Sequence, residues 1–361
     1  MTRSSTFVKR WTTRLRGPVI ILPYDGFGTG RSLALCGRVL EDEGYRPARD
    51  ADRAWRNLIA MYKRFESDEV PGARVRARHG TAEVEAVADR EGYFSVELRP
   101  DKAAAPGRWH EIALELAGSP RPAAAAGRVL VPSASARFGV ISDLDDTVIR
   151  SDVTRKLRLL LSLAVSNSRT RKPFLGVGAF YRALEKGASG KERNPIFYVS
   201  KSPWNLYVPL VEFLAHQRIT PGPLLLRDYG KHLLFASARH KEHSITRILG
   251  TYPELKFVLI GDSGEEDPEI YSEVVRRCPD RVRVIYIRSV HRDPARLAAI
   301  DRLIGEVKRT NCQLVLAPDS EFAAAHAAGE GLISARALAG IRREKAADAG
   351  IGLKPLGAAA R

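Results

Sequence analysis

Acidic side chains follow two apolar segments of the sequence at the points where those segments end. Asp143 and Asp145 close one segment, and Asp262 closes the other. Because alternate residues of an extended chain point the same way, Asp143 and Asp145 can face one common space. Two carboxylates so close together repel each other unless a cation neutralises them, and Mg²⁺ prefers such oxygen ligands. We therefore expect a magnesium site at Asp143 and Asp145, which Asp262 could complete.

A second group of residues has the character of a phosphate-binding site. Ser200 ends the apolar segment IFYVS, and a helix is expected to begin near Pro203, where free backbone N–H groups attract anions. Lys241 begins another expected helix and brings a positive charge. Acids for a metal, a hydroxyl, a helix N-terminus and a lysine together indicate phosphoryl transfer. Taken singly, these residues also fit a salt-bridge network, a helix cap (Ser200) and a surface cation (Lys241).

The pattern of residues 137–322 predicts where these side chains lie. Apolar segments alternate with amphipathic helices, which is typical of an α/β domain with a parallel sheet and helices on both faces. Ligands bind such sheets at the carboxyl ends of the strands. The acids, Ser200 and Lys241 are expected at that edge.

The rest of the chain divides into three further parts. Residues 17–136 show period-2 alternation and are expected to form a small β-sandwich-like accessory domain, with one helix over 51–65. Residues 1–16 form a basic N-terminal segment. Residues 323–361 form an Ala- and Gly-rich tail, for which loose helical packing and disorder both stay open.

The motifs resemble, in their order, those of a known superfamily. The four motifs of the haloacid dehalogenase phosphatases are similar to DLDDT, YVS, the HK before a helix, and GDSGEED. A narrower resemblance, over residues 19–319, is to the phosphatidate phosphatases of the yeast actin-patch-protein type and their bacterial relatives. It is carried by FGVISDLDDTVIRSDV, FYVSKSPWNLY and LIGDSGEEDPEIY. The resemblance implies a Rossmann-like sheet with a minimal cap.

The same resemblance implies a mechanism. Asp143 would attack phosphorus and form an aspartyl-phosphate, while Asp145 would protonate the leaving oxygen and then activate water. Mg²⁺ would bind the Asp143 carboxylate, the Asp145 backbone carbonyl and Asp262. Ser200 would hydrogen-bond a phosphoryl oxygen, and Lys241 would stabilise the developing negative charge.

Further residues would support this centre or surround it. Asp267 would orient either Lys241 or a water on the metal, and Asp146 and Thr147 would shape the loop after the nucleophile. Candidates for the substrate rim are Lys201, Trp204, Asn205, Arg227, Asp228 and Arg288.

Three of these rim residues have alternative interpretations. Lys201 stands where a serine is expected more often in relatives, which affects the pocket rim but not the chemistry. Core packing is an alternative for Trp204. Arg227 and Asp228 could instead pair with each other.

Charge narrows the class of partner. The chain has 58 Lys and Arg against 42 Asp and Glu, a net charge of +16, which favours polyanionic partners. Segment 150–172 interleaves basic residues with leucines. It could lie in an anionic membrane surface and admit a phosphorylated lipid, or pack as an ordinary helix with solvated ends. Basic and aromatic residues form no stacking platforms, so we expect no nucleic-acid partner.

The expected location in the cell rests on the lack of long apolar runs in the sequence. No run reaches the roughly 18 apolar residues of a membrane span. We expect a cytoplasmic protein, with a peripheral position on the membrane as an alternative. The sequence does not indicate an oligomeric state.

Three functions stay open at this point. The first is Mg²⁺-dependent hydrolysis of phosphatidate to diacylglycerol and phosphate. The second is hydrolysis of a soluble phosphate ester or a phosphoprotein by the same mechanism. The third is a non-catalytic lipid-binding module, which is disfavoured because such a module has no need of both Asp143 and Asp145.

Overall fold

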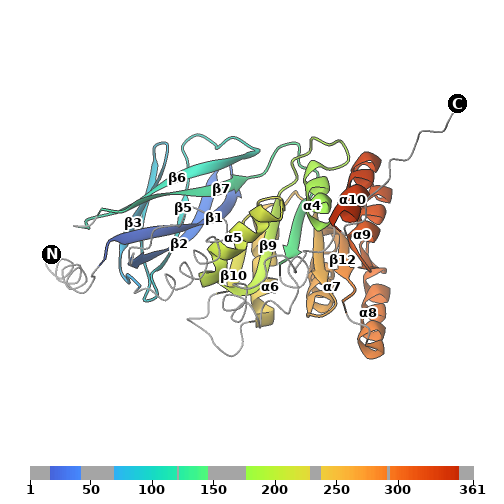
Figure 1. The fold of residues 1–361 in the computed structure, drawn as a ribbon. Helices are drawn as coiled ribbons and strands as arrows, with labels where there is room; N and C mark the ends of the chain where they lie inside the picture. Colours follow the sequence, from blue (N-terminus) through green and yellow to red (C-terminus); the bar gives the residue numbers. More distant parts are fainter. Residues whose placement is uncertain are drawn as a thin grey trace.

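The computed structural model describes residues 17–41, 69–119, 122–144, 176–227, 237–290 and 293–348. The basic segment 1–16, the expected helix over 51–65 and the segment 150–172 lie outside these ranges. Within them, an antiparallel-rich sheet lies at one end of the molecule. A parallel sheet with its helices occupies the other end (Figure 1).

The first sheet has seven strands in the order β4-β3-β6-β7-β1-β2-β5. They are β1 Val19–Thr29, β2 Ser32–Glu41, β3 Arg74–His79, β4 Ala82–Val87, β5 Tyr93–Leu98, β6 Arg108–Leu116 and β7 Ala124–Val131. Neighbouring strands are antiparallel except β1 and β7, which are parallel. The outer strands β4 and β5 contact each other. The sheet therefore curls around its own apolar core, which alternate residues of the strands supply.

The second sheet has six strands in the order β10-β9-β8-β11-β12-β13. They are β8 Gly139–Asp143, β9 Ile196–Pro203, β10 Leu224–Arg227, β11 Phe257–Asp262, β12 Val282–Arg288 and β13 Gln313–Ala317. All neighbouring pairs are parallel. Parallel strands need crossover connections, which the helices between them provide.

Helices cover both faces of the parallel sheet. They are α4 Val177–Lys186, α5 Tyr207–His216, α6 Ser237–Thr251, α7 Asp267–Arg277, α8 Pro294–Val307, α9 Ser320–Gly329 and α10 Ala335–Asp348, with short 3₁₀ turns η1 Trp204–Leu206 and η2 Pro279–Arg281. Alternate strand residues enter opposite cores: Val140 packs with α4, α5, α9 and α10, and Ile141 packs with α6, α7 and α8. Burial on both faces explains why most residues of these strands are apolar.

The two sheets meet along β1. The Tyr24 ring stacks on Trp204 with ring centroids 4.4 Å apart, and Phe27 packs edge-on against Phe197 of β9 at 5.4 Å. The backbone N–H of Asp25 donates to the Tyr207 hydroxyl at 2.7 Å. Through these contacts β1 shares the cores of the parallel sheet.

Beyond residue 322 the chain forms the rest of α9 and, after a short turn, α10, which ends at residue 348. The expected boundary at 322 falls inside α9, and Ala324 and Ala327 of that helix are fully buried. Ile341 of α10 is 1% exposed in the core shared with α4. These helices therefore belong to the parallel-sheet unit, and neither loose packing nor disorder describes residues 323–348.

Candidate active site

Two buried aspartates end neighbouring strands of the parallel sheet. Asp143 is the last residue of β8 and Asp262 the last residue of β11, and both are 0% exposed. The strands run side by side, with Ser142 paired to Ile260. This pairing brings both carboxylates to the carboxyl edge of the sheet, where open α/β sheets bind ligands.

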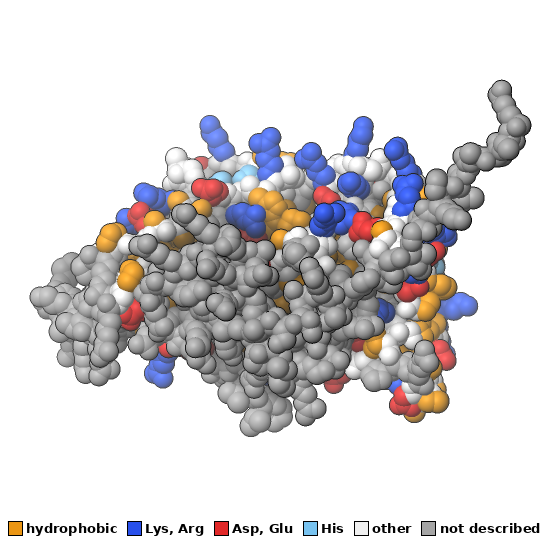
Figure 2. Space-filling view, in the orientation of Figure 1, with side chains coloured by type: hydrophobic (Ala, Val, Ile, Leu, Met, Phe, Trp, Pro, Cys, Tyr) orange, Lys and Arg blue, Asp and Glu red, His pale blue; other side chains and the backbone are white. Residues whose placement is uncertain are grey.

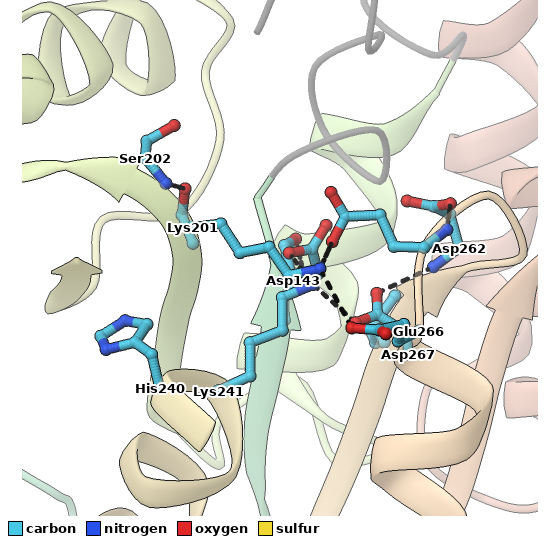
Figure 3. A network of polar contacts seen from close by, with 12 residues as sticks. Asp143, Lys201, Ser202, His240, Lys241, Asp262, Glu266 and Asp267 are labelled. Carbon is cyan, nitrogen blue, oxygen red and sulfur yellow. Dashed lines mark hydrogen bonds and ion pairs between the residues drawn. The ribbon is translucent and has the colours of Figure 1, made fainter. Parts of the chain in front are cut away.

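Lys241 of α6 lies at the centre of this edge (Figure 3). Its side chain is 1% exposed. The ammonium Nζ is 2.7 Å from Asp143 Oδ1, 2.6 Å from Asp267 Oδ1 and 2.9 Å from Glu265 Oε2. One buried lysine thus joins the end of β8 to the loop and helix that follow β11.

The electrostatics of this cluster favour a charged lysine. Burial disfavours the ammonium, but the Asp143 and Asp267 carboxylates outweigh it and raise the pKa of Lys241 well above its usual value. Burial raises the pKa of Asp267, and Lys241 opposes that rise through its charge and hydrogen bond. Lys241 therefore holds a fixed positive charge beside Asp143.

Glu265 extends the network toward the surface. Its carboxylate contacts Lys241 at 2.9 Å and Lys201 of β9 at 3.1 Å, and it is 20% exposed. Burial raises the pKa of Glu265, but the two lysines outweigh burial and hold the pKa below its usual value. Lys201, expected on the substrate rim, is thus tied to this loop.

Hydrogen bonds fix the loop between β11 and α7. Asp262 Oδ1 accepts the backbone N–H groups of Gly264 at 2.6 Å and Glu265 at 3.1 Å. Asp267 Oδ2 accepts the backbone N–H of Asp262 at 3.2 Å. Arg296 of α8 donates to the backbone carbonyls of Ser263 at 2.9 Å and Glu265 at 2.5 Å. The carboxylates are therefore held in place before any ligand arrives.

The acids of this edge fit a divalent cation. Oxygens of Asp143, Glu265 and Asp267 all lie within 4.8 Å of one another, but the Lys241 ammonium already lies between these three carboxylates. A cation at this edge would therefore lie beside the ammonium, where Asp143 and Asp262 end neighbouring strands. All the donors are carboxylate oxygens, which suit a hard cation such as Mg²⁺. With Asp262 these are four acids, against the two cations Lys201 and Lys241, which leaves two negative charges.

Two further expected site residues, Ser200 and Arg288, lie on strands next to β8 and β11. Ser200 is fully buried on β9, one residue beyond Val199, which pairs with Asp143, and its hydroxyl accepts the Ser202 N–H at 2.9 Å. Arg288 ends β12, and the last pair of the β11–β12 ladder joins it to Asp262.

The other rim candidates divide between the site and the contact of the two sheets. Trp204 stacks on Tyr24 of β1 in the contact between the sheets. The adjacent Asn205 has a buried side-chain oxygen with no hydrogen-bond partner among the described residues. Arg227 ends β10. Asp145, Asp146, Thr147 and Asp228 lie outside the described residues, so their expected roles stay predictions.

Glu265 is the site residue that the sequence analysis did not select. It lies in GDSGEED between the two aspartates that the motif pointed to. The sequence feature that could have indicated Glu265 is its position in the loop between a strand that ends in an aspartate and the expected helix that follows. Its neighbour Glu266 also lies just before the helix, but its carboxylate makes only one longer contact, 3.7 Å, with Lys201.

Comparison with known proteins identifies relatives of this region. Residues 138–289 match the family model described as the catalytic domain of phosphatidate phosphatase APP1. The chain is 32% identical over 155 residues to phosphatidate phosphatase APP1 of Saccharomyces cerevisiae, covering 42% of this chain and 26% of the yeast protein. It is 30% identical over 163 residues to an uncharacterised protein of Schizosaccharomyces pombe, covering 43% and 26%.

These matches confirm the expected resemblance to yeast phosphatidate phosphatase over the region that carries the four motifs. The chain spans only about 26% of the length of these relatives. A crystal structure of a Bacteroides fragilis protein described as an α-galactosidase aligns with a TM-score of 0.22 and 8% identity. The alignment covers 84% of this chain and 52% of that one. An overlap that low supports no inference.

Proposed function

We propose that this chain is a phosphatidate phosphatase that uses a divalent cation, Mg²⁺ being the best fit. The observation that carries the proposal is the buried Asp143–Lys241 pair at 2.7 Å. It lies at the carboxyl edge of the sheet, in a region that matches a phosphatidate phosphatase catalytic domain. We also propose a haloacid dehalogenase-like fold for this unit, which the all-parallel sheet and the four motifs in order support.

In the proposed reaction an Asp143 carboxylate oxygen attacks the phosphorus atom of the lipid phosphate. The P–O bond to the diacylglycerol oxygen breaks, and Asp145 gives that oxygen a proton. Asp145 then takes a proton from a water molecule that attacks the aspartyl-phosphate, which releases inorganic phosphate and restores Asp143. Lys241 stabilises the negative charge on the phosphoryl oxygens, and Ser200 hydrogen-bonds one of them. A cation held by the acids of this edge supplies charge neutralisation.

The supporting geometry explains why Asp143 can act as the nucleophile. Its carboxylate is fully buried and points into a network that Lys241 organises (Figure 3). A lysine that stays protonated keeps the carboxylate ionised, and an ionised carboxylate is the reactive form. Asp267 and Glu265 hold the lysine from the opposite side and so fix its position.

The test is phosphate release from phosphatidate in detergent micelles. We expect release with Mg²⁺, loss with a chelator, and a fall of at least about 1,000-fold for Asp143→Asn, because removal of a nucleophile costs that much. Asp280→Asn makes the same chemical change at an exposed residue of η2 and should leave the rate unchanged.

A substrate panel separates the alternatives. Faster hydrolysis of a soluble phosphate ester or of a phosphopeptide than of phosphatidate would move the assignment to those substrates with the mechanism intact. Binding of phosphatidate vesicles without phosphate release under any metal would instead identify a non-catalytic lipid-binding module. The peripheral membrane position proposed for segment 150–172 predicts that deletion of this segment lowers the rate on vesicles more than on the soluble ester.

A further inference from the structure

A cleft of about 710 Å³ lies between the two sheets, away from the site described above. Its walls include Ile196 and Leu224, the first residues of β9 and β10. Asp143 and Ser200 lie toward the opposite, carboxyl ends of β8 and β9. The cleft and the candidate active site therefore open at opposite edges of the parallel sheet.

The lining of the cleft combines positive charge with apolar surface. Five arginines and two acids line it, which leaves three positive charges: Arg108, Arg128, Arg182, Arg193 and Arg218 against Asp25 and Glu185. Apolar side chains from the first sheet and from α5 and the loop after it complete the walls: Trp109, Leu130, Val211, Leu214 and Ile219. Figure 2 shows Lys and Arg side chains gathered along the upper edge of the molecule, with apolar side chains exposed among them.

Two of the arginines already have partners. Arg128 binds the Asp25 carboxylate at 3.0 and 2.5 Å and lies over the Trp109 ring at 4.9 Å. Arg182 binds Glu344 of α10 at 2.5 Å. Within the described ranges no ion pair neutralises Arg108, Arg193 or Arg218. The cleft thus offers guanidinium groups that an anion from solution can bind.

The backbone at two of these arginines is in an unusual conformation. Arg193 and Arg218 both have φ of 54°, and they are the non-glycine residues of the described chain with positive φ. This left-handed region favours glycine or asparagine over residues with long side chains. Both positions line the same cleft and both carry arginine, which is the pattern expected where the side chain is retained for a ligand.

The polar groups around these arginines are preorganised. Asn194 is 1% exposed; its side-chain oxygen accepts the Arg137 N–H at 2.8 Å, and its amide donates to the Leu184 carbonyl at 2.8 Å. Thr220 also lines the cleft and is 9% exposed, and its hydroxyl has no hydrogen-bond partner in the described part of the chain. Buried hydroxyls without a partner are uncommon.

We propose that this cleft is a second ligand site, which binds an anionic amphiphile, a hydrocarbon chain with a carboxylate or phosphate head. Guanidinium groups bind such heads in bidentate fashion, and Arg108, Arg193 and Arg218 all line the cleft. The hydrocarbon chain would lie on the apolar wall that includes Trp109 and Leu214. The proposal does not depend on the proposed phosphatase activity, because no residue of the cleft belongs to the catalytic network.

The test is calorimetric titration with oleate below its micellar concentration, since oleate has no phosphate to hydrolyse. We expect one site, and at least about tenfold weaker binding for the triple variant Arg108→Gln, Arg193→Asn, Arg218→Asn, because each lost charge-assisted bond costs that order. Asparagine tolerates the left-handed backbone, so this variant should fold. The control variant loses the same charge elsewhere: Arg302→Gln, Arg309→Gln and Arg336→Gln.

Equal weakening by the cleft and control variants would overturn the proposal, since charge alone would then explain the binding. Binding of octanol or of inorganic phosphate with the same affinity as oleate would also overturn it, because the site would then recognise a hydrocarbon tail alone or an anion alone. Titration with dodecylphosphonate, whose C–P bond a phosphomonoesterase does not hydrolyse, gives the affinity for a phosphate-like head, which can be compared with the affinity for the carboxylate of oleate.

Fluorescence quenching locates the bound lipid without the use of the triple variant. A brominated stearate should quench tryptophan fluorescence, and Trp109→Phe should remove most of that quenching at stearate concentrations that saturate the variant. Undiminished quenching in Trp109→Phe would place the lipid elsewhere and would count against the cleft.

Discussion

Gly261 is the residue on which the position of Asp267 depends. A Cβ atom at this glycine would lie 2.4 Å from Asp267 Oδ2 and 2.7 Å from its Cβ. Such distances are far inside van der Waals contact, so a larger residue forces the Asp267 side chain away. Asp267 is also the carboxylate that holds Lys241 most closely, at 2.6 Å.

We predict that Gly261→Ala lowers both activity and stability. Displacement of Asp267 releases Lys241 from its position beside Asp143, and a misplacement of this size costs about 100-fold in rate. Overpacking of the site should lower the free energy of unfolding by about 1–3 kcal/mol. Phosphate release and urea denaturation measure the two effects.

Gly250 of α6 provides the matched control for this substitution. Nothing lies within 4 Å of a Cβ atom built there, so Gly250→Ala adds the same methyl group without a clash. Alanine favours helix over glycine, so we expect a gain of about 0.5–1 kcal/mol and unchanged activity. Full activity of Gly261→Ala would show that the position of Asp267 is not needed.

The sequence indicated that some residues of the candidate site would lie at one edge of the sheet, but it did not indicate Glu265, for a physical reason. Asp143 and Asp262 follow strands that are apolar throughout, so their convergence at one edge follows from strand direction. Lys241 was expected to begin a helix, but α6 already includes Ser237, so Lys241 lies in its second turn, and its side chain reaches Asp143 from there. Glu265 lies in a loop, and its contacts depend on a backbone path that Arg296, thirty-one residues later, helps to fix. No local pattern encodes such a contact.

At the scale of elements, α5 ends in a hydrogen-bonding pattern that usually requires glycine. The Ile219 N–H donates to the Leu214 carbonyl at 2.9 Å and the Arg218 N–H to the Ala215 carbonyl at 3.0 Å. This is the Schellman motif, whose left-handed residue is usually glycine. Here that residue is Arg218, with φ of 54°.

We predict that Arg218→Gly stabilises the protein. Glycine adopts the left-handed conformation without a steric penalty, and after the larger entropy loss of glycine on folding a gain of about 0.5–1 kcal/mol remains. Urea denaturation measures the change. Arg218→Ala serves as the control, because alanine removes the side chain but keeps the steric penalty. An equal gain from both variants would attribute the effect to the lost arginine side chain and not to the backbone.

The helices after residue 322 show where element prediction from sequence fails. Alanine-rich segments have little contrast between apolar and polar faces, and Ala323, Ala324 and Ala327 all enter the core despite their small side chains. Their burial depends on the close approach of α4, which a local pattern does not contain. The strands were more accessible to prediction, because period-2 alternation marks half-buried strands and continuous apolar runs mark fully buried ones.

At the scale of the whole molecule, the contact between the two sheets makes the stability of each sheet depend on the other. Tyr24 and Phe27 come from the first sheet but belong to the cores of the parallel sheet. The hydroxyl of Tyr252, the residue after α6, also donates to the Gly28 carbonyl at 3.1 Å. Sequence patterns mark β1 as a strand but do not show which neighbour its aromatic side chains meet. The shared core implies that neither sheet keeps its full stability without the other.

No helix in the described part of the chain combines the length and the apolar character that crossing a membrane requires. Because Tyr24 and Phe27 of the first sheet pack in the cores of the parallel sheet, we expect the protein to unfold as one cooperative unit. Differential scanning calorimetry should show one transition with equal calorimetric and van't Hoff enthalpies. Phe94→Ala removes a ring that is 3% exposed from the core of the first sheet, and it should lower the free energy of unfolding by about 3–5 kcal/mol. If the sheets are coupled, it also lowers the temperature at which phosphatase activity is lost.

Val87→Ala supplies the comparison for Phe94→Ala within the same sheet. Val87 is 65% exposed, so its truncation removes little buried surface and should leave both the calorimetric and the activity midpoints in place. Coupling requires that Phe94→Ala shift the two midpoints together, since the active site is remote from residue 94. Two separate transitions, or an activity midpoint that Phe94→Ala does not move, would show that the sheets unfold independently and that the β1 contacts contribute little.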